Sequence, residues 1–444
     1  NSFGEFLDAV DSIPHDIDVA MQVPHGALRL NVMGERGADH EEATPSDIAA
    51  MAELARQGIE AGALGFSTSR TRNHKTSTGA YTPTLTAAPD ELVGIAQGVG
   101  ATGTGVLQVV SDFLDPDGEF AMLRAMVATS GRPMSISIAR NPMVPDAFRR
   151  LLDHISAANA DGLVMTGQVA PRAVGLILGL ECTLNPFLTN PVFREFADRS
   201  LAEKVAALRD PGFRQRLLSE AAERSRDKLG GNLIGRFDLL FEMGDEPDYE
   251  PSLESSIGAI AARSGRSAEE VALDAMLAED GHGLLYLPFL NYVDGSLDGC
   301  HEMLVHPYTV PGLGDGGAHV GTICDGSFPT TLLAYWGRDR DHDRIPLPFL
   351  VQRHCRDTAR TVGLLDRGVI APGYRADLNV VDFDRLRLHK PEIVHDLPAN
   401  GRRLLQRADG WRHTIVAGHE TYHDGVATDA LPGRLVRGAQ PAPA

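Results

Sequence analysis

The sequence predicts an α/β fold, a parallel barrel of the (β/α)8 type followed by a small β domain. First, short apolar segments alternate with amphipathic segments about every 30 to 40 residues, the spacing of strand–helix–strand units. Second, 444 residues suffice for such a barrel with a smaller appendage. Third, the apolar run Tyr308–Pro311 leads into the Gly-rich segment 312–319, which carries one carboxylate, Asp315. A carboxylate at the C-terminal end of a barrel strand is in the place where barrels of this type carry out chemistry.

Six barrel strands are predicted from these apolar segments. They cover residues 17–23, 65–67, 106–110, 134–138 and 163–166, and the sixth is the strand that ends at Asp315. Helices with a 3.6-residue apolar period are predicted at 49–59, with Ser46 as a cap, and at 89–97, 119–128 and 145–158. Because the chain opens at Asn1 directly on a helical pattern, we expect strands 1 and 2 of the barrel to precede this sequence.

The remaining segments divide the chain into domains. Residues 1–367 are predicted to form the barrel, with a helical insertion at about 190–282. The insertion includes the charged segment 201–227 and a capping box that begins at Ser267. It either covers the barrel mouth or consists of peripheral helices. A last barrel helix is expected at 345–364. Alternating polar and apolar residues then predict a small β domain at 368–430, and the Pro/Gly/Ala-rich residues 431–444 a flexible tail.

Composition excludes several classes of function. The net charge of −19 argues against a nucleic-acid partner, because phosphate backbones require a basic face. No apolar run is long enough to cross a membrane, and the cytoplasm is the default compartment. The four cysteines are widely separated and form no CxxC pair, which argues against disulfides and against a zinc site made of cysteines alone.

Several motifs resemble those of one enzyme family. Gly368–Leu378 resembles the G-x-L-x-P-G-x-x-A-D-L signature of metal-dependent amidohydrolases. Gly62–Thr68 resembles the GA-x-G-F-S-T segment of the N-acyl-D-amino-acid deacylase (D-aminoacylase) branch, and Pro24–Arg29 resembles its GHGTLR segment. Gly321-Thr322 followed by Ser327–Pro329 resembles the G-T-F-P that follows the strand-8 aspartate. The order of the motifs along the chain makes the resemblance specific.

The resemblance implies a (β/α)8 barrel with a β-sandwich, and zinc or another divalent ion. It implies hydrolysis of the amide bond of an N-acylated D-amino acid or a related small molecule by a metal-activated water. Asp315 corresponds by position to the aspartate that binds the metal and acts as general acid and base. The main metal ligands, an H-x-H pair on strand 1, are expected upstream of residue 1.

The sequence also departs from the family pattern. Strands 5 and 6 of relatives each end in a histidine ligand, whereas residues 106–112 and 135–140 contain no histidine, and Ile138 occupies the strand-6 position. The usual two-metal cluster is therefore incomplete, and one ion held by the upstream pair and Asp315 is the remaining possibility. We expect little or no activity from this truncated chain.

Further candidates are assigned on their positions at predicted strand ends. His319 and Arg140 are candidate substrate-binding residues, and a guanidinium group suits a substrate carboxylate. Ser67 and Gln108 are candidates for the lining of the pocket, with Ser69 and Asp112 as alternatives, and His25 is a candidate for supporting the site from behind. For each there is a structural alternative: a turn residue, a surface arginine or a histidine bonded within the fold.

Three functions are consistent with these residues. The first is an N-acyl-D-amino-acid deacylase that cleaves a linear amide, which the 62–68 and 24–29 segments favour. The second is a cyclic-amide hydrolase similar to dihydropyrimidinases or dihydroorotases. The third is a non-catalytic barrel that binds a ligand, which the missing strand-5 and strand-6 histidines favour.

Overall fold

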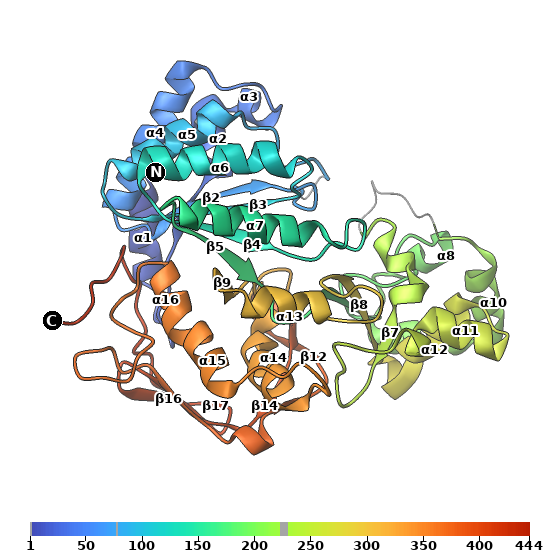
Figure 1. The fold of residues 1–444 in the computed structure, drawn as a ribbon. Coiled ribbons are helices and arrows are strands. Elements are labelled where there is room, and N and C mark those ends of the chain that lie inside the picture. The colour runs from blue at the N-terminus through green and yellow to red at the C-terminus, as the bar shows by residue number, and fades with distance from the viewer. Residues whose placement is uncertain (1, 77–78, 223–229) are drawn as a thin grey trace.

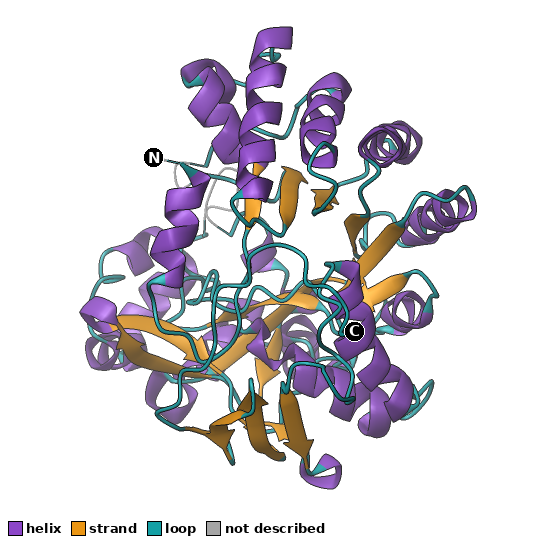
Figure 2. Ribbon diagram, turned by 90° about the vertical axis from the view of Figure 1, so that its left-hand side faces the viewer, coloured by secondary structure: helices purple, strands orange, loops and turns teal. Residues whose placement is uncertain are grey.

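The computed structural model describes residues 2–76, 79–222 and 230–444. At its centre lies a six-stranded, wholly parallel sheet with the order β1-β2-β3-β4-β5-β9. These strands cover Gln22–Pro24, Gly65–Arg70, Val106–Ser111, Met134–Ile138, Met165–Val169 and Thr309–Pro311. They form an arc with helices along its outer side (Figure 2). The predicted parallel α/β fold is confirmed. Among the described residues, β1 and β9 are the two edges of the sheet, and the closed eight-stranded barrel remains a prediction.

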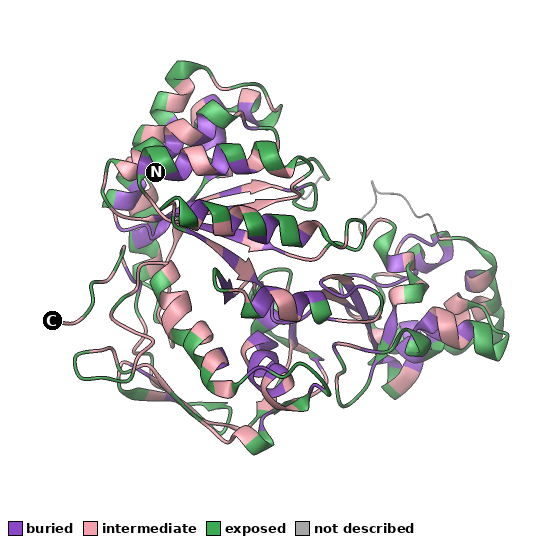
Figure 3. Ribbon diagram, viewed as in Figure 1, coloured by how far each residue is buried: buried purple, intermediate pink, exposed green. Residues whose placement is uncertain are grey.

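Helices cover the outer face of the sheet and bury its core (Figure 3). They are α1 to α7 (Phe3–Asp11, His25–Met33, Glu35–Ala38, Pro45–Glu60, Pro89–Gly100, Pro116–Ser130, Ala147–Ala160) and α13 to α16 (Asp298–Val305, Phe328–Ala334, Leu347–Gln352, Thr358–Thr361). Helix α4 begins earlier than predicted, because Thr44 rather than Ser46 caps it in a capping box with Asp47. No helix among the described residues is long and apolar enough to cross a membrane.

The predicted helical insertion forms part of a separate lobe with its own apolar core (Figure 1). Its helices α8 to α12 cover Pro191–Arg194, Leu201–Arg209, Pro211–Ser219, Ile257–Ser264 and Ala268–Gly281. Residues 223–229 of the helix expected at 201–227 lie outside the described residues. The lobe also contains an antiparallel sheet, β6-β8-β7, formed by Val174–Leu178, Leu284–Leu290 and Phe241–Met243. The lobe lies on the side toward which the β5 arrowhead points in Figure 1.

The C-terminal region contains antiparallel strands, in agreement with the alternating pattern. The largest sheet has the order β10-β15-β16-β17 (Leu378–Val381, Trp411–Val416, His419–His423, Val426–Ala427). Two smaller ladders pair β11 with β14 and β12 with β13 (Arg387–Leu388, Ala408–Asp409, Glu392–Leu397, Gly401–Leu405). The tail expected to be flexible is packed instead: Val436 N donates to Val19 O at 2.7 Å, and Leu435 and Val436 are buried. Apolar burial and backbone pairing with the N-terminal segment outweigh its Pro/Gly-rich composition.

Candidate active site

The Gly-rich segment lies in the loop between β9 and α14. Strand β9 ends at Pro311, so Asp315 is four residues beyond the strand rather than at its end, and its side chain is exposed. Leu313 and His319 both have positive φ, at 66° and 50°, which is uncommon for residues with a Cβ. Such backbone strain persists where surrounding contacts fix a loop, and it is frequent at functional sites.

A buried ion pair fixes the backbone at Asp315. The Asp315 amide N–H donates to Asp325 Oδ2 at 3.1 Å. The other carboxylate oxygen of Asp325 is 3.3 Å from Arg172 Nη2, which also donates to the carbonyl oxygen of Cys324 at 2.9 Å. Arg172 is 4% exposed, and its guanidinium carbon lies 3.9 Å from the centroid of the Tyr249 ring. Burial raises the pKa of Asp325, and the charge of Arg172 opposes that shift.

A histidine that the sequence left unassigned shares this edge of the sheet. His74 follows β2, and its Nδ1 lies 2.7 Å from Ser69 Oγ. Burial lowers the pKa of His74. The charge of Asp315 raises this pKa and His319 lowers it, so His74 lies near both Asp315 and His319. No recognisable motif surrounds His74, which is why sequence reasoning missed it.

Asp112 and Ser69 are also at this edge. Asp112 follows β3 and accepts hydrogen bonds from Thr71 Oγ1 at 2.5 Å and from the Arg72 amide at 2.9 Å. It therefore holds the loop that carries His74.

Polar side chains from three neighbouring strands form a network within the sheet. Gln168 Nε2 donates to Ser135 Oγ, and Gln108 Nε2 lies 3.5 Å from Gln168 Oε1. Ser67 on β2 is the register partner of Gln108 on β3. The structure thus brings Ser67 and Gln108 together. The network consists of neutral amides and hydroxyls, which are poor zinc ligands compared with imidazole or thiolate.

Arg140 and His25 lie away from these groups. Arg140 Nε donates to Pro145 O at 3.2 Å, its side chain packs against Gly299 on α13, and no described contact links it to Asp315. His25 is 1% exposed at the start of α2; its Nε2 lies 2.7 Å from Glu91 Oε1, and its Nδ1 lies 2.9 Å from Thr68 Oγ1.

A cavity of about 270 Å³ lies beneath the Asp315 loop. Gly312, Gly314, Asp325, Phe328 and His354 are among its lining residues. Burial lowers the pKa of His354. The cavity is largely apolar, and Gly314 and Gly316 of the loop that carries Asp315 line it.

The residues at this edge do not complete a metal site. Among the described residues, only two groups of three or more His, Cys, Asp or Glu side chains bring their donor atoms within 4.8 Å of one another. Neither group includes Asp315, His74 or His319. Carboxylate and imidazole are ligand types that zinc uses, but these donor atoms do not converge on one point.

Comparison with known proteins identifies the family. The model of the amidohydrolase family matches residues 1–422. The chain belongs to the amidohydrolase family. A D-aminoacylase of Alcaligenes xylosoxydans xylosoxydans is 31% identical over 448 residues, which cover 98% of this chain and 73% of the relative. An uncharacterised protein of Mycobacterium tuberculosis (strain ATCC 25618 / H37Rv) is 25% identical over 449 residues, which cover 93% of this chain and 69% of the relative.

Solved structures agree with this assignment at the level of the fold. A D-aminoacylase structure described in terms of its binuclear metal centre matches with a TM-score of 0.61 at 21% identity. The match covers 98% of this amidohydrolase and 75% of the D-aminoacylase chain. A D-aminoacylase variant in complex with CuCl2 has a TM-score of 0.60 at 20% identity, with the same coverage. The resemblance to the D-aminoacylase branch that the sequence motifs indicated is confirmed.

Proposed function

We propose that this amidohydrolase cleaves the linear amide bond of an N-acylated D-amino acid or a related small molecule, with Asp315 as general acid and base. The observation that carries the proposal is the position of Asp315: a carboxylate beyond a parallel strand, exposed, with its backbone held by the buried Arg172–Asp325 pair. Asp315 would take a proton from the attacking water. It would then return that proton to the nitrogen as the carbon–nitrogen bond breaks.

The proposed roles of the neighbouring residues follow from their positions. Ser67 and Gln108, paired across β2 and β3, would line the substrate pocket. His319, four residues after Asp315, would contact the substrate. Arg140, which follows β4 and has no described contact with Asp315, would bind the substrate carboxylate. His25 would support the site from behind, since it bonds Thr68 on the strand that carries Ser67.

One zinc ion remains part of the proposal, with Asp315 as its ligand. A bound zinc ion would lower the pKa of a coordinated water. The described residues at the sheet edge do not complete its ligand set, so no proton transfer proposed above is derived through the ion. We also retain the proposal that the arc of strands belongs to a (β/α)8 barrel.

The test compares Asp315→Asn with the wild type and with Asp341→Asn, a matched exposed aspartate outside the site. The protein expressed from its natural gene and residues 1–444 are assayed in parallel, each with added ZnCl2. The substrates are a panel of N-acetyl-D-amino acids, with hydantoins and dihydropyrimidines as cyclic amides. Metal content is measured by mass spectrometry on the same samples.

In the protein expressed from its natural gene, we expect turnover of the linear amides, a loss of about 10²-fold or more in kcat for Asp315→Asn, and no change for Asp341→Asn. Residues 1–444 alone should show little or no turnover. Equal kcat in all three proteins would contradict the role of Asp315. Turnover of only the cyclic amides would support a dihydropyrimidinase-like enzyme instead.

A second candidate is a non-catalytic barrel that binds a small ligand. The neutral network of Gln108, Ser135 and Gln168 favours it, because amides and a hydroxyl occupy strand positions suited to hydrogen bonding a ligand. Binding of an N-acetyl-D-amino acid by calorimetry without turnover, in a protein that holds no zinc, would support this candidate.

A further inference from the structure

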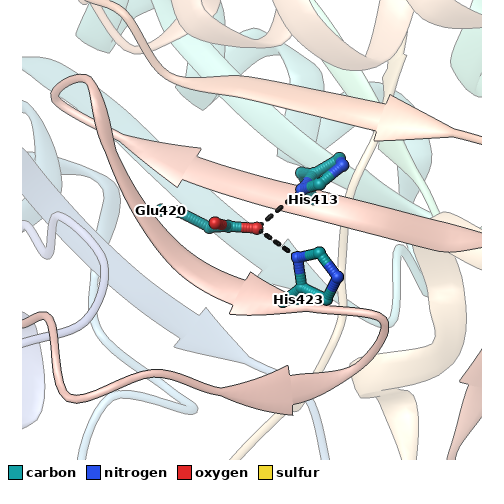
Figure 4. A group of neighbouring side chains, drawn as sticks. All are labelled: His413, Glu420 and His423. Carbon is teal, nitrogen blue, oxygen red and sulfur yellow. Dashed lines mark hydrogen bonds and ion pairs between the residues drawn. The ribbon is translucent and has the colours of Figure 1, made fainter.

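Three side chains converge on the exposed face of the C-terminal sheet (Figure 4). Glu420 Oε1 lies 2.6 Å from His413 Nδ1 and 2.9 Å from His423 Nδ1. The two imidazole ring centroids are 4.8 Å apart, and all three side chains are more than a third exposed. Two imidazoles therefore direct the same ring nitrogen toward one carboxylate oxygen.

A β-bulge produces this arrangement. In β16, Glu420 and His423 are three residues apart, and in a regular strand an odd separation places side chains on opposite faces. The register pairs His413 with His423 and Thr414 with Tyr422, but then pairs Ile415 with Glu420, so Thr421 is the extra residue. The bulge returns Glu420 to the face of His413 and His423. Bulges are known to re-aim side chains in this way.

Two neighbouring residues of the same strands are buried. Thr421 is 1% exposed and Val416 is 7% exposed. His419, the register partner of Val416, is an exposed histidine at the start of β16 and takes no part in the cluster. The bulge thus places Glu420 beside the two histidines on one exposed face, while Thr421 and Val416 are buried.

We propose that His413, Glu420 and His423 form a zinc site, with water in the fourth position. Two imidazoles and one carboxylate are a donor set that zinc uses in open, four-coordinate sites. In a tetrahedral site with bonds of about 2.1 Å, ligand atoms lie about 3.4 Å apart. The observed separations of 2.6 and 2.9 Å would therefore have to open by less than about 1 Å, which exposed side chains achieve by small rotations.

The surroundings of His423 support metal binding. Its Nε2 lies 3.6 Å from Asp424 Oδ2, and Arg412 holds the other oxygen of Asp424 at 2.8 Å. At 3.6 Å this contact is longer than a hydrogen bond, but it places a carboxylate on the distal side of the imidazole, as is common for metal-binding histidines. In the other described cluster, Asp298 with His342 and Asp343, the carboxylate of Asp298 already pairs with Arg340, whose positive charge opposes the binding of a cation there.

The test is zinc binding by calorimetry to tag-free protein that has been treated with chelator, with zinc stoichiometry measured by mass spectrometry. The variants are Glu420→Gln and His423→Asn, and the matched control is His419→Asn. Circular dichroism verifies that each variant is folded, and exposure of all three positions makes unfolding unexpected. Thermal unfolding with and without ZnCl2 provides a second readout.

We expect the wild type and His419→Asn to bind one zinc ion per chain more than His423→Asn, or to bind it at least 100-fold more tightly. Zinc should raise their melting temperature above that of the His423→Asn and Glu420→Gln variants, since a ligand of the folded state stabilises it. Comparison between variants separates this site from any zinc near Asp315. The same stoichiometry and affinity in all four proteins would overturn the proposal.

Discussion

Replacement of Glu91 by Gln should destabilise the junction of α2 and α5 more than any surface change. Glu91 accepts hydrogen bonds from Arg29 Nη1 at 2.5 Å and from His25 Nε2 at 2.7 Å, and the three side chains are at most 1% exposed. Loss of the carboxylate leaves a buried guanidinium group without its counter-ion. The side-chain NH₂ group of Gln would also point at one of the two donors, Arg29 Nη1 or His25 Nε2, and two donors cannot form a hydrogen bond. Breaking a buried pair in this way costs about 3 to 5 kcal/mol, and solvent screening does not reduce that cost here.

Urea unfolding followed by circular dichroism measures this loss. With a slope of about 3 kcal/mol/M, the midpoint of Glu91→Gln should fall by about 1 to 1.7 M. The control is Glu302→Gln, which removes a carboxylate from an exposed pair between α13 and Arg149 of α7 and should leave the midpoint unchanged. Equal midpoints for the two variants would refute the reasoning that burial makes the Glu91 pair essential.

The same cluster predicts loss of stability in acid. Burial lowers the pKa of His25 below 6.5, and the hydrogen bond from His25 and the charge of Arg29 lower the pKa of Glu91 below 4.5 despite its burial. The unfolded chain therefore binds more protons than the folded chain as the pH falls below about 6.5, so the free energy of unfolding decreases in that direction. The urea midpoint should fall progressively between pH 7 and pH 4. A midpoint independent of pH over this range would contradict the assignment of His25 as a neutral, buried imidazole.

Three further predictions concern packing, thiol reactivity and the Asp315 loop. A Cβ at Gly65 would overlap a backbone carbonyl of β3, so Gly65→Ala should lower the free energy of unfolding by about 3 kcal/mol or more, or prevent soluble expression. A Cβ at Gly244 meets nothing within 4 Å, so the control Gly244→Ala should resemble wild type in urea unfolding. Of the four free cysteines, only Cys355 is exposed. One thiol should therefore react rapidly with a chromogenic disulfide at pH 8, and the other three should react only in denaturant. Rapid reaction of two or more thiols would contradict the described burial. Asp325→Asn should lower kcat with little change in KM, because it loosens the backbone of Asp315, and an unchanged kcat would argue against that positioning role.

The sequence by itself determined the parallel α/β architecture. Buried parallel strands are short apolar runs, and capped amphipathic helices separate them, so local composition was enough to locate β3 and β4 almost to the residue. The capping box at Ser267 was likewise local and is present. Several motifs in their order along the chain, from Pro24 to Leu378, indicated the family.

Only the tertiary structure decided the contacts that shape the two candidate sites. Arg172 and Asp325 are 153 residues apart, and nothing in either local sequence indicates that they meet behind Asp315. The antiparallel sheet of the lobe was missed because a short apolar run such as Leu284–Leu290 is equally consistent with a buried strand or a buried helix segment. The proposed zinc-ligand face depends on one extra residue, Thr421, whose effect appears only when β15 and β16 pair. A strand's periodicity is local, but its register is set by the partner strand, and register decides which side chains meet.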